Sequence, residues 1–494
     1  MRQTSKKISS NLFDNERPAV QNILALVSLA ALVIIFIVYG SSLPAYALFV
    51  ALALIFILPA YNYLGLMLII FLTMLFERFF TLQPLLINDA VYKLYPLDIV
   101  MAITLIAWAI NWRWGKIKPK LFLEWPEKLL LFFLIAVCLY LVRSLSDVNA
   151  SLAVAFSSFK NYTWYPLLYF LTIFTIQDAK KFKNFLHLLL ITGIMLVGYI
   201  IIGISSGQGL WTEFTPLSTA GVRLLAGTHA FYLLLLSLIA FSLYTFDRFK
   251  NNAIAALLIW IWILGIVISL MRHLWLGLAL GVLILLAIIP LRNKKFLLRQ
   301  GAKNILIALT VIMIIILIAS LTMIQNTGLN FYGVLNTFSQ RLVSIYQNSA
   351  DTSASWRLDL WYSAKQLWLT NPIFGLGFGK SILLNWQNWH SFEEIRNLHN
   401  SPLAILVQMG VIGLGLFLAA VAGVLIAGLK SITAANELRP YYLGIFIGII
   451  VYLFCSLFQP YLETNLMGIF FWIWLGLLRT SKLLITDKDS DTKI

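Results

Sequence analysis

Long apolar runs recur along almost the whole chain and predict its secondary structure. Each is about 15 to 28 residues long, close to the roughly 20 residues that an α-helix needs to cross a bilayer. The runs lack the alternation of apolar and polar positions that is typical of membrane-spanning β-strands. The pattern predicts an all-α, polytopic integral membrane protein with about 12–14 transmembrane helices. The expected spans are 22–39, 45–60, 62–76, 96–111, 128–145, 162–176, 185–204, 229–246, 253–271, 274–291, 304–324, 401–428, 441–458 and 465–478.

One long polar segment interrupts this series. Residues 326–400 hold no apolar run of membrane length over about 75 residues, whereas the median connection is about 4–6 residues. Long loops on a rigid scaffold often carry function. We therefore expect a partly helical outer loop here. It delivers the sequence Asn397-Leu398-His399-Asn400 to the start of the run 401–428.

Composition and charge support the membrane assignment. The chain is 61% hydrophobic and only 11% charged, where a soluble protein carries about 25% charged residues. The net charge of +16 is concentrated in loops that the topology places in the cytoplasm, which is the positive-inside pattern of a multi-pass plasma-membrane protein. Both termini are then expected to be cytoplasmic. The basic excess indicates contact with the lipid bilayer, and we expect no nucleic-acid partner.

Few side chains offer metal chemistry, and several offer proton transfer. The two cysteines, Cys138 and Cys455, are isolated in apolar runs and predict neither a disulfide nor a metal site. No cofactor or metal is expected. Four of the five histidines fall on the outer side, where a histidine can act as a general base near neutral pH. Any one of them can equally be an interfacial hydrogen-bonding residue, but His399 stands out because of the sequence around it.

Four short motifs follow one another from the end of the span 253–271 onward. Arg272 and His273 open the next span, and an Arg-x-x-x-Trp element begins at Arg357. An Asn-Pro-x-x-Gly-x-Gly-x-Gly sequence occupies 371–379, and His399-Asn400 precedes a glycine-rich span. In this order the region from about 254 to 427 resembles the O-antigen ligase and Wzy-type polysaccharide polymerase superfamily. Two positions depart from that family: Met271 replaces a serine, and Gln408 stands where an acidic residue is common.

The resemblance implies a function and a division of the chain. Members transfer a glycan from undecaprenyl pyrophosphate to an acceptor hydroxyl at the outer face of the bacterial inner membrane. The expected parts are an N-terminal transmembrane bundle (1–252), a ligase-related region (253–430) that includes the loop 326–400, and a C-terminal helix pair with a charged tail (431–494). We expect the tail beyond Arg479 to be disordered. Transfer by a single displacement implies inversion at the anomeric carbon.

The resemblance also assigns roles to residues. His399 is the expected catalytic base, because an acceptor hydroxyl is a poor nucleophile until its proton is removed. Arg272 is the first candidate for binding the pyrophosphate, whose charge a guanidinium neutralises with bidentate geometry; the alternative is an arginine that only anchors at the interface. Arg223, Arg357 and Asn400 complete the expected substrate-binding set. Arg223 can also be a solvated loop charge, and Arg357 can instead orient the loop helices.

Several alternatives stay open at this level. The sequence does not separate a polymerase, which extends another lipid-linked glycan, from a ligase that uses a lipid A core or another acceptor. A lipid-linked oligosaccharide flippase is the alternative from a different class. A flippase should carry charge through the membrane midplane, whereas the charges here gather in the loops. A purely structural membrane scaffold would tolerate replacement of His399 and Arg272. Glu393 and Glu394 form a second possible base pair or a solvated face.

Overall fold

A computed structural model describes most of the chain. The residues it describes are 42–58, 63–76, 84–87, 90–92, 94–115, 124–205, 227–297, 299, 310, 352–386, 389–433 and 437–491. The expected spans 22–39 and 304–324, and Arg223 with its loop, lie outside these ranges.

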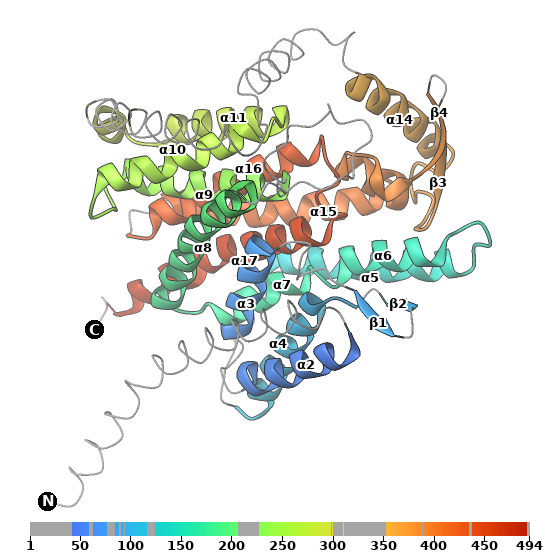
Figure 1. Ribbon diagram of the computed structural model, residues 1–494, viewed down its shortest axis with the longest axis horizontal. Helices are drawn as coiled ribbons and strands as arrows, with labels where there is room; N and C mark the ends of the chain where they lie inside the picture. The colour runs from blue at the N-terminus through green and yellow to red at the C-terminus, as the bar shows by residue number, and fades with distance from the viewer. Residues whose placement is uncertain are drawn as a thin grey trace, which may run out of the picture. The chain divides into compact units, whose positions relative to one another are not determined.

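The described chain is dominated by α-helices (Figure 1), which confirms the predicted fold class. Six of its helices are long and apolar enough to cross a membrane, and four shorter apolar helices accompany them within the described ranges. The protein is therefore a multi-pass membrane protein. The helices are α2 (Leu43–Ile57), α3 (Tyr63–Leu75), α4 (Pro96–Arg113), α5 (Trp125–Leu145), α6 (Leu152–Thr163), α7 (Leu167–Thr175), α8 (Ala179–Ser205), α9 (Gly227–Thr245), α10 (Asn252–Ile268), α11 (Arg272–Ile288), α14 (Thr352–Leu369), α15 (Ser401–Thr433), α16 (Arg439–Ser456) and α17 (Asn465–Asp491).

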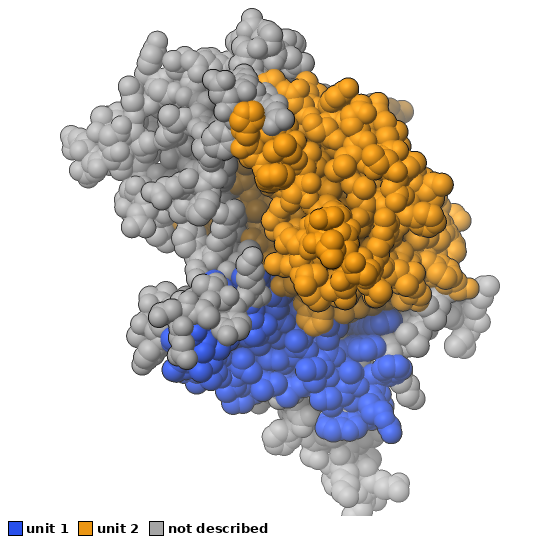
Figure 2. Space-filling model, turned by 90° about the vertical axis from the view of Figure 1, so that its right-hand side faces the viewer, with its two compact units in different colours: residues 1–120, 174–176 blue, residues 121–173, 177–494 orange. Residues whose placement is uncertain are grey.

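Two compact units make up the molecule (Figure 2). The first comprises residues 1–120 and 174–176 and contains α2, α3, α4 and a short hairpin of β1 (Leu85–Ile87) and β2 (Ala90–Tyr92). In this unit α4 packs against both α2 and α3. Gly65 allows the close approach of α3 to α4, since a Cβ there would lie 2.1 Å from the hydroxyl oxygen of Thr104. The second unit comprises residues 121–173 and 177–494 and holds the motifs.

The core of the second unit is a bundle formed by helices from distant parts of the sequence. Helix α15 packs along α5, α16 packs between α9 and α11, and α17 contacts both α15 and α16. Buried charges fasten the middle of α17 to α5: Arg479 Nε donates to Glu127 Oε1 at 2.6 Å, and both side chains are almost fully buried. Removing Arg479 alone would leave Glu127 buried without its cation, which typically costs about 3–5 kcal/mol. Arg479 itself has a second carboxylate partner, Glu124, at 2.9 Å.

A small layer of mixed structure covers the start of α15. It consists of α14, the antiparallel hairpin of β3 (Ser381–Trp386) and β4 (Trp389–Glu394), and the 3₁₀ turn η2 (Ile395–Asn397), which lie together at one end of the bundle (Figure 1). A continuous apolar cluster joins this layer to α15, so the layer is anchored to the bundle. The cluster contains Trp356, Leu360, Ala364, Ile382, Leu384, Ile395, Leu398, Ala404 and Val407.

The structure also corrects three sequence predictions. Two β-hairpins occur where only loops were expected. The expected span 162–176 is broken into α6 and α7 around Pro166, whose ring cannot continue a helix and which restricts the preceding residue. The tail expected to be disordered from Arg479 continues as helix α17 to Asp491. Arg479 and Leu483 are buried in its first part, so packing outweighs the polar composition.

Candidate functional site

The turn between α10 and α11 places Arg272 at the first position of α11. Leu270 in this turn has a φ of 57°, a left-handed conformation that is unfavourable for a side chain without a local polar group. The backbone N–H of Met271 donates to Ser269 Oγ at 3.4 Å, and Trp275 Nε1 donates to Ile266 O at 3.2 Å, so both sides of the turn are fastened. Strained residues persist only where their surroundings fix them. The position of Arg272 is therefore defined by its turn.

His399 occupies a second left-handed position, with a φ of 51°, directly before α15. Its Nδ1 lies 3.1 Å from Gln459 Oε1. An amide oxygen only accepts hydrogen bonds, so Nδ1 carries the proton and the lone pair is on Nε2. The indole of Trp356 meets the ring edge to face, with centroids 5.4 Å apart. Tautomer and orientation of the ring are thus both set by neighbours.

The surroundings of His399 keep its ring neutral. Burial and, to a smaller extent, the positive charge of Arg357 lower the pKa of His399 to about 4, against the opposing effect of the hydrogen bond with Gln459. Arg357 lies on α14, next to Trp356. Trp361, on the same helix, donates from Nε1 to the carbonyl oxygen of Leu398 at 2.8 Å. Helix α14 therefore positions the backbone before His399 and contributes the charge that affects its ring.

The glycine motif at 371–379 docks against a break in α15. Gly410 has φ 64° and ψ −168°, which interrupts the helix. The backbone groups freed there are bonded by the motif: the N–H groups of Leu376 and Gly377 donate to Val407 O and Gln408 O, both at 2.9 Å. In return the N–H of Val411 donates to Pro372 O at 3.0 Å. These bonds pair backbone groups on both sides of the break with the motif.

The glycines are required by this close contact. Gly375, Gly377 and Gly379 all have positive φ values, which glycine adopts at little cost in a tight turn. A Cβ at Gly375 would lie 2.5 Å from the backbone nitrogen of Gly410. The far side of the turn is held by α5, where Arg143 Nη1 donates to Gly375 O at 3.0 Å and Ser144 Oγ accepts from Phe378 N at 2.8 Å. The motif therefore supports α15 from the side.

The short connection between α16 and α17, residues 457–464, joins the pieces of the site. Besides Gln459, it carries Tyr461, whose hydroxyl lies 2.8 Å from His273 Nε2. It also carries Glu463, whose Oε2 accepts a hydrogen bond from Ser401 Oγ at the start of α15. One eight-residue connection thus contacts the residue after Arg272, the ring of His399 and the first residue of α15.

Glu463 was not predicted as a site residue. Its carboxylate is 6% exposed, and Tyr162 donates to its Oε1 at 2.5 Å. Burial raises the pKa of Glu463 to about 7, although hydrogen bonds from Ser401 and Tyr162 and the charge of Arg396 act in the opposite direction. Sequence offered one signal for it: a lone carboxylate in a short connection between two apolar runs. The motifs end near Leu418 and do not extend to Glu463.

Residues 256–418 match the family model described as O-Antigen ligase. This segment is similar to the O-antigen ligase family. It contains Arg272, Arg357, His399 and Asn400, while the connection 457–464 lies beyond it. A search of curated proteins found no match.

The predicted residues in this segment differ in the contacts that they make. His399 and Arg357 interact electrostatically. His273, the residue after Arg272, contacts the same 457–464 connection that contacts His399. Asn400 caps α15, with its Oδ1 accepting from Leu403 N at 3.0 Å; its role toward substrate stays a prediction. The alternative base Glu394 is ion-paired with Arg396 at 2.5 Å.

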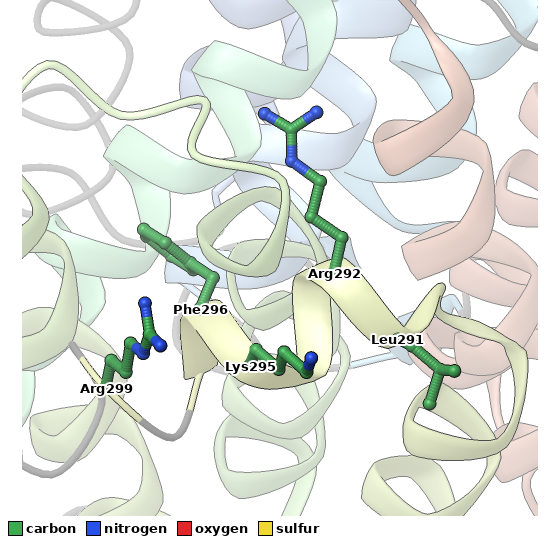
Figure 3. A pocket seen from close by; sticks show the side chains of 5 residues that line it. All are labelled: Leu291, Arg292, Lys295, Phe296 and Arg299. Atoms are coloured by element: carbon green, nitrogen blue, oxygen red, sulfur yellow. The ribbon is translucent and has the colours of Figure 1, made fainter.

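A surface cavity of about 570 Å³ lies elsewhere. Its lining residues follow the other end of α11 and are predominantly basic (Figure 3): Leu291, Arg292, Lys295, Phe296 and Arg299. An α-helix rises about 1.5 Å per residue, so the length of α11 separates this cavity from Arg272 by roughly 25 Å. The cavity contains none of the motif residues and is not the candidate site.

Proposed function

We propose that this protein transfers a glycan from undecaprenyl pyrophosphate to an acceptor hydroxyl at the outer face of the bacterial inner membrane. The observation that carries the proposal is His399: a neutral ring whose Nδ1–H is held by Gln459, beside a cation, in a segment similar to the O-antigen ligase family. A base with its lone pair on Nε2 is what activation of a hydroxyl requires.

The residues take these roles in a single displacement. Nε2 of His399 accepts the proton of the acceptor hydroxyl as its oxygen attacks the anomeric carbon. The bond between that carbon and the pyrophosphate oxygen breaks, and undecaprenyl pyrophosphate leaves with the bonding electrons. Arg272 neutralises the charge that develops on the leaving group, with Arg223 as a second cation. Attack opposite the leaving group inverts the anomeric configuration.

The test uses the purified full chain in detergent with a defined undecaprenyl-pyrophosphate oligosaccharide. The donor is supplied alone and then with a lipid A core acceptor. Longer glycans from donor alone indicate a polymerase, and product that requires the core indicates a ligase. His399→Ala should lower the rate by about 10²- to 10⁴-fold, as the loss of a general base does. Arg272→Ala should also lower the rate strongly.

His390→Ala is the matched control. His390 lies on β4 in the same layer, but its side chain is exposed, so this variant should retain the native rate. A folded His399→Ala protein that is as fast as the native chain would refute the assignment of the base. Donor translocation in liposomes without any product would favour the flippase.

A further inference from the structure

The buried carboxylate of Glu463 has a costly environment that the roles above do not explain. Burying an ionisable group away from water is unfavourable unless a cation or hydrogen bonds compensate it. No cation among the described residues forms an ion pair with Glu463; its charge is met by hydroxyl donors and by the more distant field of Arg396. A leucine or methionine at this position would avoid the desolvation cost, which indicates that the carboxylate has a function.

Contacts of Glu463 converge on the start of α15. Ser401 Oγ donates to the carboxylate, and the backbone N–H of Leu462 in turn donates to Ser401 Oγ at 3.1 Å. From α6, Tyr162 donates to the other carboxylate oxygen, and Asn161 Nδ2 donates to the backbone carbonyl of Glu463. Ser401 is two residues after His399. The carboxylate therefore connects α6 and the 457–464 connection to the backbone that carries the proposed base.

The same connection acts directly on the histidine ring. Gln459, four residues before Glu463, accepts the hydrogen bond from Nδ1 of His399. If the anchor at Glu463 is lost, the connection can move relative to α15, and both supports of the ring are affected together. A catalytic group that is displaced by about 1 Å can lose roughly 10²-fold in rate.

We propose that Glu463 is a positioning residue whose ionised carboxylate, bonded by Ser401 and Tyr162, fixes His399 in its working orientation and makes glycan transfer dependent on pH near neutrality. This inference rests on the proposed function. In the ionised form both carboxylate oxygens accept from hydroxyls; protonation turns one oxygen into a donor, which reverses or weakens one of the two contacts.

Glu463 and His399 titrate in different pH ranges, so the effect of the carboxylate can be measured separately from that of the ring. Because the pKa of Glu463 is raised to about 7 while that of His399 is lowered to about 4, the carboxylate is the one of these two groups that changes charge between pH 6 and 8. The rate should thus increase as the pH rises through about 7. The titratable and charged groups that face the carboxylate are Tyr162 of α6, Arg396 of η2 and Tyr452 of α16.

The experiment measures kcat and kcat/KM between pH 5.5 and 9 for the native chain, Glu463→Gln and Tyr162→Phe. Glu463→Gln should have a lower kcat with a nearly unchanged KM for donor, and the rise near pH 7 should disappear. Tyr162→Phe removes a hydrogen bond that favours the ionised carboxylate, so the rise should move to higher pH by roughly 0.5–1 unit. Asp359→Asn, at an exposed carboxylate on α14, should leave the profile unchanged.

The outcomes separate this inference from the proposed function. If product forms but the rise near pH 7 persists in Glu463→Gln, or does not move in Tyr162→Phe, the positioning role is wrong and the transferase stands. If Glu463→Gln does not fold, the shift in Tyr162→Phe still decides. If the native chain makes no product, the proposed function fails and infrared spectroscopy replaces kinetics. A carboxyl band that titrates near pH 7, and titrates at higher pH in Tyr162→Phe, would still support the anchoring role of Glu463. A band whose titration is the same in both proteins would refute that role as well.

Discussion

Oε1 of Gln459 lies 3.1 Å from Nδ1 of His399, a residue 60 positions earlier in the chain. Because the amide oxygen accepts, this contact leaves the lone pair of the imidazole on Nε2. An uncharged acceptor holds the tautomer without the strong increase in pKa that a carboxylate would cause. The ring thus stays neutral at physiological pH even though it is held in a fixed orientation.

Replacing Gln459 should change the rate of transfer more than the binding of the donor. Gln459→Leu retains side-chain bulk but removes the acceptor, so the loss of about 1–1.5 kcal/mol should lower kcat by roughly 5- to 10-fold. Gln459→Glu keeps the acceptor but raises the pKa of His399, so it should retain the rate only at pH values above that raised pKa. Steady-state kinetics of the three proteins provide the measurement, and a Leu variant with native kcat would show that the contact is dispensable.

Arg357 should control the pKa of His399. Its positive charge disfavours the imidazolium, so Arg357→Gln should raise the pKa of His399 from about 4 toward its ordinary value of 6.5. The charged form would then persist to higher pH. Arg357→Lys preserves the charge and should leave the pKa nearly unchanged. An NMR titration of ring-labelled histidines, with His399→Ala to assign the resonance, measures the shift; identical titrations of Gln and Lys variants would exclude the electrostatic effect.

Periodicity and composition were sufficient for the helical framework but not for its irregularities. The apolar run 185–204 appears as α8, and 441–458 appears as α16 with a boundary shift of two residues. The break at Gly410 was invisible, because a glycine in an apolar run looks the same whether or not the helix continues through it. What breaks α15 is a pairing with residues 371–379, and such long-range contacts leave no local periodicity.

In the candidate site, too, local sequence indicates some residues, while others depend on long-range contacts. His399, Arg272 and Arg357 were found from local motifs, and a family model matches the segment that contains them. Gln459 and Glu463 were missed because each acquires its significance from contacts across about 60 residues, with His399 and Ser401. Nothing in the local sequence 457–464 indicates those partners.

Asn400 has two roles that mutations can separate. Its Oδ1 caps α15, and the amide nitrogen is the part that could bind substrate. Asn400→Ser retains a good capping residue without the amide, so it should keep the native melting temperature and weaken donor binding. Asn400→Ala should also lower stability by about 1 kcal/mol, because it removes the cap. Thermal unfolding in detergent and the KM for donor measure the two effects. A Ser variant with native KM would restrict Asn400 to capping.

Two glycines of α15 should respond oppositely to substitution by alanine. At Gly410 a Cβ would lie 2.1 Å from Ile373 O, and the residue has a φ of 64°. The left-handed conformation alone costs about 1–2 kcal/mol, and the clash with backbone atoms adds to it. Gly410→Ala should therefore strongly reduce the melting temperature, because the turn 371–379 can no longer dock on the break.

Gly415 is the matched control five residues further along the same helix. A Cβ there has open space around it and its φ is not positive. Alanine is favoured over glycine in a helix by about 0.5–1 kcal/mol, so Gly415→Ala should be neutral or slightly stabilising. Melting temperatures of both variants in one detergent decide the point. If Gly410→Ala has the same melting temperature as the native chain, α15 continues as a regular helix through residue 410. The glycine motif then does not serve to support a break.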